Sequence, residues 1–139
     1  MDIFFSMSYF VSYQSTVAQD NMSKFIKSFG YAFSGISHAF KSQFNFRFHV
    51  IVLILVLIAG SYFNLSASEW LWIVAAAGIV LFSELFNTAL EVLVDLVSPN
   101  IHPKAKIIKD VAAAAVLIAA VTAVIIGLII FIPKLTYAS

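Results

Sequence analysis

The 139-residue sequence contains no cysteine, which excludes a disulfide framework and any metal site built from thiolates. Charge is also scarce, since 11% of the residues are charged and the formal net charge is +1. So few basic side chains exclude the electropositive surface that nucleic-acid-binding proteins need. The sequence has no internal repeat and no low-complexity linker, so one compact domain is expected.

Apolar side chains, in contrast, make up 62% of the chain. That fraction exceeds what a soluble domain of this length can bury around one core, so the sequence predicts a membrane protein. A helix crosses the hydrocarbon core with about 20 apolar residues. Three runs are long enough, and they predict an all-α fold with transmembrane helices over about 48–66, 70–97 and 108–132.

The basic residues orient these spans. By the positive-inside rule, the N-terminus and the 98–110 loop are expected in the cytoplasm, and the 60–69 connection and the C-terminus outside. Lys134 is the one basic residue on the outer side of this arrangement. The cytoplasmic set is Lys24, Lys27, Lys41, Arg47, Lys104, Lys106 and Lys109.

The segment before the first span predicts an amphipathic helix over about 23–44, lying in the cytoplasmic interface. A helix packed on a soluble partner is the alternative. Residues 1–21 lack the basic start and cleavage site of a signal peptide. They are expected to be a disordered, dispensable extension or a misassigned start before a domain over 22–139, and loss of activity on their deletion would overturn this hypothesis. The apolar positions of the helix, spaced by three and four, are Phe25, Phe29, Phe33, Ile36 and Phe40.

A polar face interrupts the second half of the 70–97 span, in the sequence LFSELFNTALEVLVDLV. At 100° per residue, its members lie within an arc of about 80° on one side of a helix. Charged groups in hydrocarbon are unfavourable, so this face should point into the bundle or toward cytoplasmic water, as a functional site. The alternative is a set of polar contacts between helices. The members are Glu84, Asn87, Glu91 and Asp95.

The loop that follows, SPNIHPKAKIIKD, adds positive charge at the same membrane boundary. Lysines in such a place commonly reach the lipid headgroups. Beside a carboxylate cluster, however, ammonium groups that bind phosphate and carboxylates that hold Mg²⁺ would suit phosphoryl transfer to a lipid alcohol. A nucleotide would be bound unconventionally, because the sequence has neither a G-x-x-x-x-G-K-[ST] motif nor the protein-kinase motifs.

The pattern E-x-x-N-[ST]-A-x-E-x-x-x-D, present as ELFNTALEVLVD, is followed by KDVAAAAVL and preceded by GYAFSGISHAF and NFRFH. With these motifs, residues 24–130 resemble the bacterial integral-membrane diacylglycerol kinase and undecaprenol kinase family. The resemblance implies a homotrimer in the inner membrane, with ATP as donor, Mg²⁺ as cofactor and active sites between subunits near the cytoplasm. NFRFH favours the undecaprenol kinase branch, although the sequence does not choose between the two lipids.

The resemblance also implies roles for single residues. Glu84 matches the general base that takes the proton from the lipid hydroxyl, and Glu91 matches a carboxylate that binds the nucleotide-associated Mg²⁺. Asn87 would orient nucleotide or metal, and Lys109 and Asp110 would contact the nucleotide. Further positions match residues near the nucleotide, namely Lys24, Tyr31 and His102, or near the lipid, namely Asn45 and Arg47.

Gln43 departs from the family, because many members carry a second metal-binding Glu at this position. A Gln carbonyl can still bind Mg²⁺, but the site loses a negative charge and, with it, metal affinity. The sequence therefore predicts weaker activity, a greater dependence on Glu91, or a homologue that has lost catalysis and acts in membrane binding or assembly.

Two further functions are compatible with parts of the sequence. A non-catalytic assembly module would use the acidic face and the four alanines at 112–115 to pack helices closely. A proton or ion carrier would use Glu84 and Glu91 as a relay, but the last span has no ionisable residue after Asp110 to continue that path.

For His102 there is also an alternative to nucleotide binding: it can be an exposed loop histidine that binds no ligand.

Overall fold

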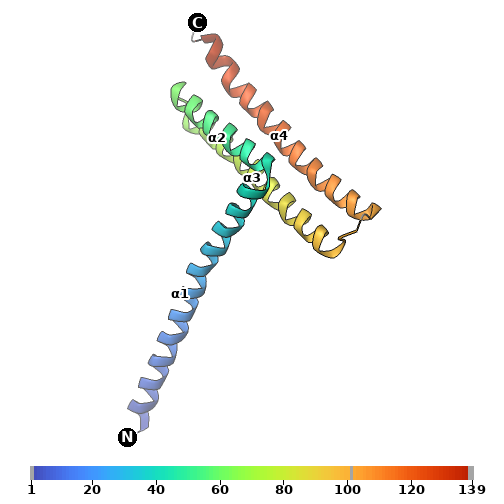
Figure 1. Cartoon of the computed structure of the whole chain (residues 1–139). Helices are drawn as coiled ribbons and strands as arrows, with labels where there is room; N and C mark the ends of the chain where they lie inside the picture. Colours follow the sequence, from blue (N-terminus) through green and yellow to red (C-terminus); the bar gives the residue numbers. More distant parts are fainter. Residues whose placement is uncertain (1, 101, 138–139) are drawn as a thin grey trace. The chain divides into compact units, whose positions relative to one another are not determined.

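The computed structural model describes residues 2–100 and 102–137, and the chain is helical over nearly all of both ranges (Figure 1). The predicted all-α fold is therefore confirmed. The helices, in chain order, are α1 (Asp2–Ser42), α2 (Phe44–Tyr62), α3 (Ala67–Val97) and α4 (Pro103–Tyr137).

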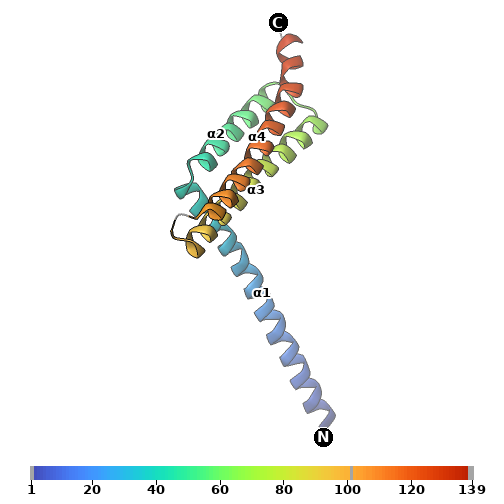
Figure 2. The ribbon, with the colours of Figure 1, turned by 90° about the vertical axis from the view of Figure 1, so that its right-hand side faces the viewer.

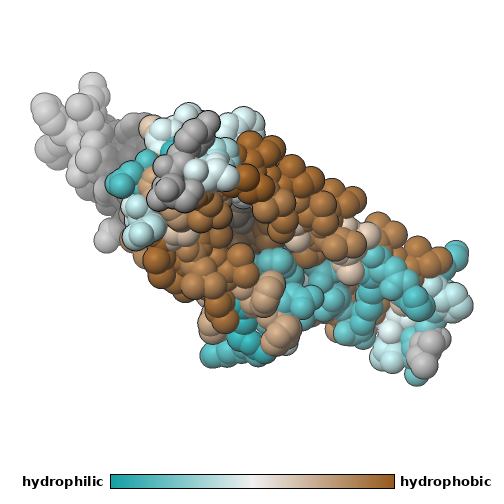
Figure 3. Space-filling model, turned by 90° about the horizontal axis from the view of Figure 1, so that it is seen from above, coloured by the Kyte–Doolittle hydropathy of each residue, from teal (hydrophilic) through white to brown (hydrophobic). Residues whose placement is uncertain are grey.

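Three of these helices are long and apolar enough to cross a membrane, namely α2, α3 and α4. This agrees with the three predicted spans. Large apolar side chains such as Ile54, Phe82 and Leu117 are exposed on them, and Figure 3 shows an extensive hydrophobic surface. Hydrocarbon solvates such a surface, whereas water would drive it to aggregate. The chain is therefore a membrane protein.

The chain divides into two units, and residues 1–38 form the first. This unit is the larger part of α1, which begins at Asp2 and not near residue 23. The reason is that residues 2–22 contain neither proline nor glycine, so no residue there interrupts a helix. The rings of Phe25 and Phe29 meet edge to face on this helix, with centroids 5.1 Å apart. That residues 1–21 are dispensable stays a prediction.

In the second unit, residues 39–139, α3 packs against both α2 and α4 (Figure 2). The connection from α2 to α3 is tight, and Asn64 adopts a positive φ of 51° there. A capping box then starts α3: the Ser66 N–H donates to Glu69 Oε2 at 2.7 Å, and the Glu69 N–H donates to Ser66 Oγ at 3.4 Å. Because these bonds satisfy N–H groups of the first turn, α3 starts at Ala67, three residues before the predicted bound.

A small apolar core lies near this connection. Leu65, Ile73 and Ile130 are buried together, and Trp70 packs against them. Gly60 of α2 is also buried there, and a Cβ on this residue would lie 2.6 Å from Cη2 of the Trp70 ring. The close approach of α2 to the tryptophan therefore depends on glycine.

α4 exceeds its predicted bounds at both ends. It begins at Pro103, because proline is favoured in a first turn, where its missing N–H would have no helical partner. It also continues through Pro133, past the predicted end near residue 132. Helices in membranes tolerate internal proline better than soluble helices do. In the last turn of α4, the Thr136 hydroxyl donates to Pro133 O at 2.9 Å. Beside it, Lys134 Nζ lies 3.1 Å from Glu69 Oε1, which joins α4 to the start of α3.

Candidate active site

The polar face of α3 becomes more exposed toward the C-terminal end of the helix. Glu84 is 2% exposed and Asn87 is 8% exposed, whereas the Asp95 side chain is 66% exposed. Thr88 belongs to the buried part, and its hydroxyl donates to the backbone carbonyl of Glu84 at 2.8 Å. The face therefore leads from a buried carboxylate to an accessible one.

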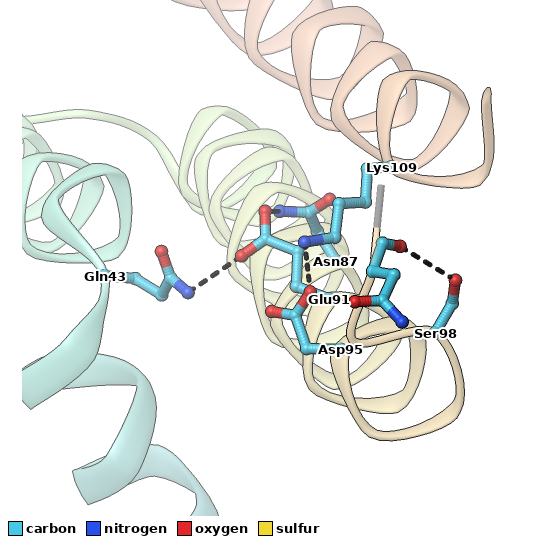
Figure 4. Close-up of polar contacts among 7 residues, drawn as sticks. Gln43, Asn87, Glu91, Asp95, Ser98 and Lys109 are labelled. Carbon is cyan, nitrogen blue, oxygen red and sulfur yellow. Dashed lines mark hydrogen bonds and ion pairs between the residues drawn. The ribbon is translucent and has the colours of Figure 1, made fainter. Parts of the chain in front are cut away.

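Glu91 is the centre of a hydrogen-bond network on this face (Figure 4). Its Oε1 accepts a bond from Nδ2 of Asn87 at 3.0 Å, and its Oε2 accepts a bond from Nε2 of Gln43 at 2.9 Å. Both carboxylate oxygens are thus bound by neutral amides. The two residues that the resemblance assigns to the metal, Gln43 and Glu91, lie in direct contact.

Gln43 reaches Glu91 because of its place between two helices. It is the N-cap residue of α2, with φ −106° and ψ 120°, and its side chain makes no capping bond to its own helix. Its N–H donates to Ala39 O at 2.8 Å, which closes the last turn of α1. The side chain is then free to extend toward α3 (Figure 4). Because the extended residue lies here, α2 starts at Phe44 and not near residue 48.

Two ion pairs lie at the accessible end of the face. Lys109 of α4 places Nζ 2.5 Å from Oδ1 of Asp95 and so joins α4 to α3 (Figure 4). Lys106 places Nζ 2.5 Å from Oδ2 of Asp110, one turn away on α4, and both side chains are exposed. Of the two nucleotide contacts predicted on α4, Lys109 therefore lies against the acidic face, and Asp110 pairs within its own helix.

At the buried end, Glu84 meets a residue that the spacing of the sequence does not single out. His49 of α2 places Nε2 3.2 Å from Oε1 of Glu84, within ion-pair distance but without the alignment of a hydrogen bond. The His49 side chain is 19% exposed. The sequence did contain one indication of a role for His49, because it is an ionisable residue near the start of the uncharged apolar run over 48–68.

A groove of about 390 Å³ lies among α2, α3 and α4 and extends from this buried end. Apolar side chains of all three helices line it, including Val52, Val80 and Val124. His49 is the one polar side chain among the described residues that line the groove. Such a groove suits an apolar chain whose polar end lies at His49, beside Glu84.

Oxygen donors gather around Glu91. Asn87 Oδ1 is buried and has no hydrogen-bond partner within the part of the chain that the structure describes. Together with the Glu91 carboxylate and the Gln43 amide, it offers the ligand types that Mg²⁺ prefers. Residues 2–100 and 102–137 contain no group of three His, Asp or Glu side chains placed to hold a metal alone. The donor set therefore fits an ion that also binds the phosphates of a nucleotide.

Two predicted ligand-binding residues contact helix ends. Arg47 Nη1 donates to the carbonyl oxygens of Phe40 and Lys41, at 3.0 Å and 3.1 Å, near the end of α1. His102 precedes α4, and its Nδ1 accepts a bond from the Lys104 N–H at 3.2 Å. These contacts explain why the residue types suit their positions, while their roles toward lipid and nucleotide stay predictions.

The other predicted residues lie on exposed helix surfaces. Lys24 and Tyr31 are exposed on the part of α1 that forms the first unit. Asn45 is exposed in the first turn of α2 and lies outside the network around Glu91. Their ligand roles also stay predictions.

Comparison with known proteins shows what kind of chain carries this arrangement. Residues 30–131 match the family described as prokaryotic diacylglycerol kinase. The chain belongs to this family. The undecaprenol kinase of Bacillus subtilis (strain 168) is 44% identical over 117 residues, which cover 84% of this chain and 95% of that protein. The predicted membership of a membrane lipid kinase family is therefore confirmed.

Two relatives named diacylglycerol kinase extend the family to other organisms. The protein of Synechocystis sp. (strain ATCC 27184 / PCC 6803 / Kazusa) is 45% identical over 109 residues, covering 78% of this chain and 62% of that protein. The protein of Escherichia coli (strain K12) is 28% identical over 102 residues, covering 73% of this chain and 84% of that protein. The matched region of the family includes the whole of α2 and α3 and most of α4.

Proposed function

We propose that the chain transfers the γ-phosphoryl group of ATP to the hydroxyl group of a membrane lipid alcohol, with Mg²⁺, at the cytoplasmic interface. One observation carries this proposal: the face of α3 leads from Glu84 beside an apolar groove, through the oxygen donors around Glu91, to Lys109. Phosphoryl transfer needs a site for the acceptor hydroxyl, a site for the metal ion and its phosphates, and a cation that binds the phosphates. Residues suited to these three roles lie in this order along the face of α3. The names of the relatives, undecaprenol kinase and diacylglycerol kinase, supply the two lipid alcohols.

Glu84 serves the acceptor side of the reaction. A lipid that enters laterally from the bilayer would place its chain in the groove and its hydroxyl beside the Glu84 carboxylate. Glu84 then accepts the hydroxyl proton while the hydroxyl oxygen bonds to the γ-phosphorus and the bond to ADP breaks. The burial of Glu84 keeps water away from this proton transfer.

Glu91, Asn87 and Gln43 serve the donor side, as the residues that would hold Mg²⁺. When bound, the ion neutralises charge on the phosphate oxygens. Asn87 offers its Oδ1, which has no hydrogen-bond partner among the described residues, and Gln43 offers its amide oxygen once the amide turns away from Glu91. Lys109 would leave its ion pair with Asp95 and bind the phosphates of the nucleotide instead. The resemblance adds Asp110, His102, Lys24 and Tyr31 as nucleotide contacts, and Asn45 and Arg47 as lipid contacts.

We also propose a homotrimer in the bacterial inner membrane, with the N-terminus in the cytoplasm. The trimer is implied by the family resemblance. The orientation is supported by the positive-inside rule, because Lys104, Lys106 and Lys109 flank one membrane boundary and Lys134 flanks the other.

The proposal is tested by the transfer of labelled phosphate from ATP, catalysed by the purified protein in lipid nanodiscs. Undecaprenol and a diacylglycerol are offered separately, each with Mg²⁺ and with excess chelator. Mg²⁺-dependent label in one lipid establishes the kinase and identifies its substrate. Folded protein that labels neither lipid would overturn the proposal, and a non-catalytic assembly protein would then be the better description.

A further inference from the structure

His49 connects the groove to Glu84. Its Nε2 lies 3.2 Å from Oε1 of Glu84, and its ring lies at the edge of the groove as the polar member of the described lining. The ring also meets Phe48 edge to face, with centroids 5.8 Å apart. One side chain therefore contacts both the carboxylate and the space in which an apolar ligand fits.

Apart from His49, no described residue serves as a partner for Oε1 of Glu84. No group in residues 2–100 and 102–137 donates a hydrogen bond to this buried Oε1, and a buried polar atom without a partner is destabilising. The nearby polar side chains are already engaged: the Thr88 hydroxyl donates to the Glu84 backbone carbonyl, and the Asn87 amide donates to Glu91. His49 is therefore the group whose position allows it to bind Oε1.

We propose that His49 is a positioning residue for Glu84. Its Nε2–H donates to Oε1 and fixes the carboxylate, so that the second oxygen faces a hydroxyl at the end of the groove. Because the two atoms are already 3.2 Å apart, a rotation of the imidazole ring is enough to align this bond. The inference rests on the proposed function, in which Glu84 accepts the proton of the lipid hydroxyl.

Such a role affects turnover more than lipid binding. The apolar side chains of the groove bind the lipid chain, and they do so whether or not the carboxylate is fixed. A carboxylate held in the reactive orientation, in contrast, stabilises the transition state of proton transfer. Loss of the His49 bond should therefore lower kcat and leave the KM for lipid nearly unchanged.

The first experiment measures kcat and the lipid KM of His49→Leu, His49→Gln, Glu84→Gln and the double variant His49→Leu with Glu84→Gln. His49→Leu should lower kcat by about 10–100-fold, as expected for loss of a hydrogen bond to a charged group. His49→Gln keeps an N–H donor at the same distance along the side chain and should restore most of this loss. Combined with Glu84→Gln, His49→Leu should lower kcat no further, because it acts through the missing carboxylate.

The same set of variants can overturn the inference. A fully active His49→Leu protein would do so, as would an equal loss from His49→Leu in the wild-type and Glu84→Gln backgrounds. A fall in unfolding temperature that matches the fall in activity, with no rescue by Gln, would assign His49 to packing alone. Failure of the proposed function would give different results: the wild type would transfer no phosphate, or Glu84→Gln would have no effect on turnover.

A second measurement does not depend on activity. In protein labelled with ¹⁵N at histidine, the ring nitrogens of His49 are assigned by their absence from the spectrum of His49→Gln. A proton on Nε2, with a resonance that shifts in Glu84→Gln, is the expected result. A His49 spectrum that is unchanged by Glu84→Gln would show that the two side chains do not interact and would overturn the inference.

Discussion

The amide of Gln43 donates a hydrogen bond from Nε2 to Oε2 of Glu91, over 2.9 Å. This bond joins the break between α1 and α2 to the middle of the polar face of α3. By resemblance, many family members have Glu at the position of Gln43, and two carboxylates at this distance would repel each other until a cation lay between them. If the proposed Mg²⁺ site is correct, the amide therefore stabilises the site without metal and lowers the negative charge that a metal would meet.

Gln43→Glu should reverse this balance. Without Mg²⁺, the repulsion between the introduced carboxylate and Glu91 should lower the unfolding temperature, and added Mg²⁺ should raise it above that of the wild type. The Mg²⁺ concentration that gives half-maximal phosphoryl transfer should fall by about tenfold, because charge count governs the affinity of an oxygen-ligand site. Titration of the unfolding temperature and the transfer rate with Mg²⁺ measures both effects.

Gln43→Met is the matched control, because it keeps the length of the side chain and removes the amide without adding charge. It should weaken the response to Mg²⁺ relative to the wild type. If the Glu and Met variants both respond to Mg²⁺ as the wild type does, Gln43 has no part in a metal site, and its bond to Glu91 only joins helices.

Glu84→Gln should lower turnover by about 10²–10⁴-fold, the contribution expected of a general base. The unfolding temperature should change little, because the amide nearly preserves the shape of the side chain. Glu69→Gln is the control: it makes the same chemical change on α3, at the capping box that pairs with Lys134, and it should leave turnover intact. Parallel losses of activity and stability in Glu84→Gln would favour the polar contact between helices over the base.

Lys109→Gln should raise the KM for ATP by about tenfold, because it would remove the proposed charge-assisted contact to phosphate. Lys104→Gln is the control, since Lys104 is exposed near the start of the same helix, and its KM should stay close to that of the wild type. ATP should also protect Lys109 from an amine-reactive reagent more than it protects Lys104. Equal modification of the two lysines with and without ATP would contradict the assignment of Lys109 to the phosphates.

Spacing along one helix could be read from the sequence, but packing between helices could not. Glu84, Asn87 and Glu91 share a face of α3 because successive residues of any α-helix turn by 100°. The partners Gln43 and His49 come from the start of α2, whose apolar side chains surround the helix and so leave its rotation toward α3 undetermined. That rotation decides which polar side chain of α2 meets which carboxylate.

Hydropathy also placed helix ends less well than local chemistry does. The capping box of Ser66 and Glu69 starts α3 before the apolar run begins, and its S-x-x-E pattern is visible in the sequence. Pro133, in contrast, is a common stop signal in a soluble helix, yet α4 continues past it. The role of Lys109 came from family resemblance, because a lysine at a membrane boundary has the same local pattern whether it binds phosphate or headgroups.

A last prediction concerns the packing that holds α2 against the start of α3. Gly60→Ala places a methyl group 2.6 Å from the Trp70 ring, and Trp70 cannot withdraw without disturbing the core around Leu65 and Ile73. Overpacking of this kind destabilises by about 1–3 kcal/mol. Gly78→Ala is the control, because apart from the adjoining residues and backbone of its own helix no described atom lies within 4 Å of the added methyl, so it should be neutral or stabilising. Unfolding temperatures measure the difference, and equal values for the two variants would show that Trp70 moves aside freely.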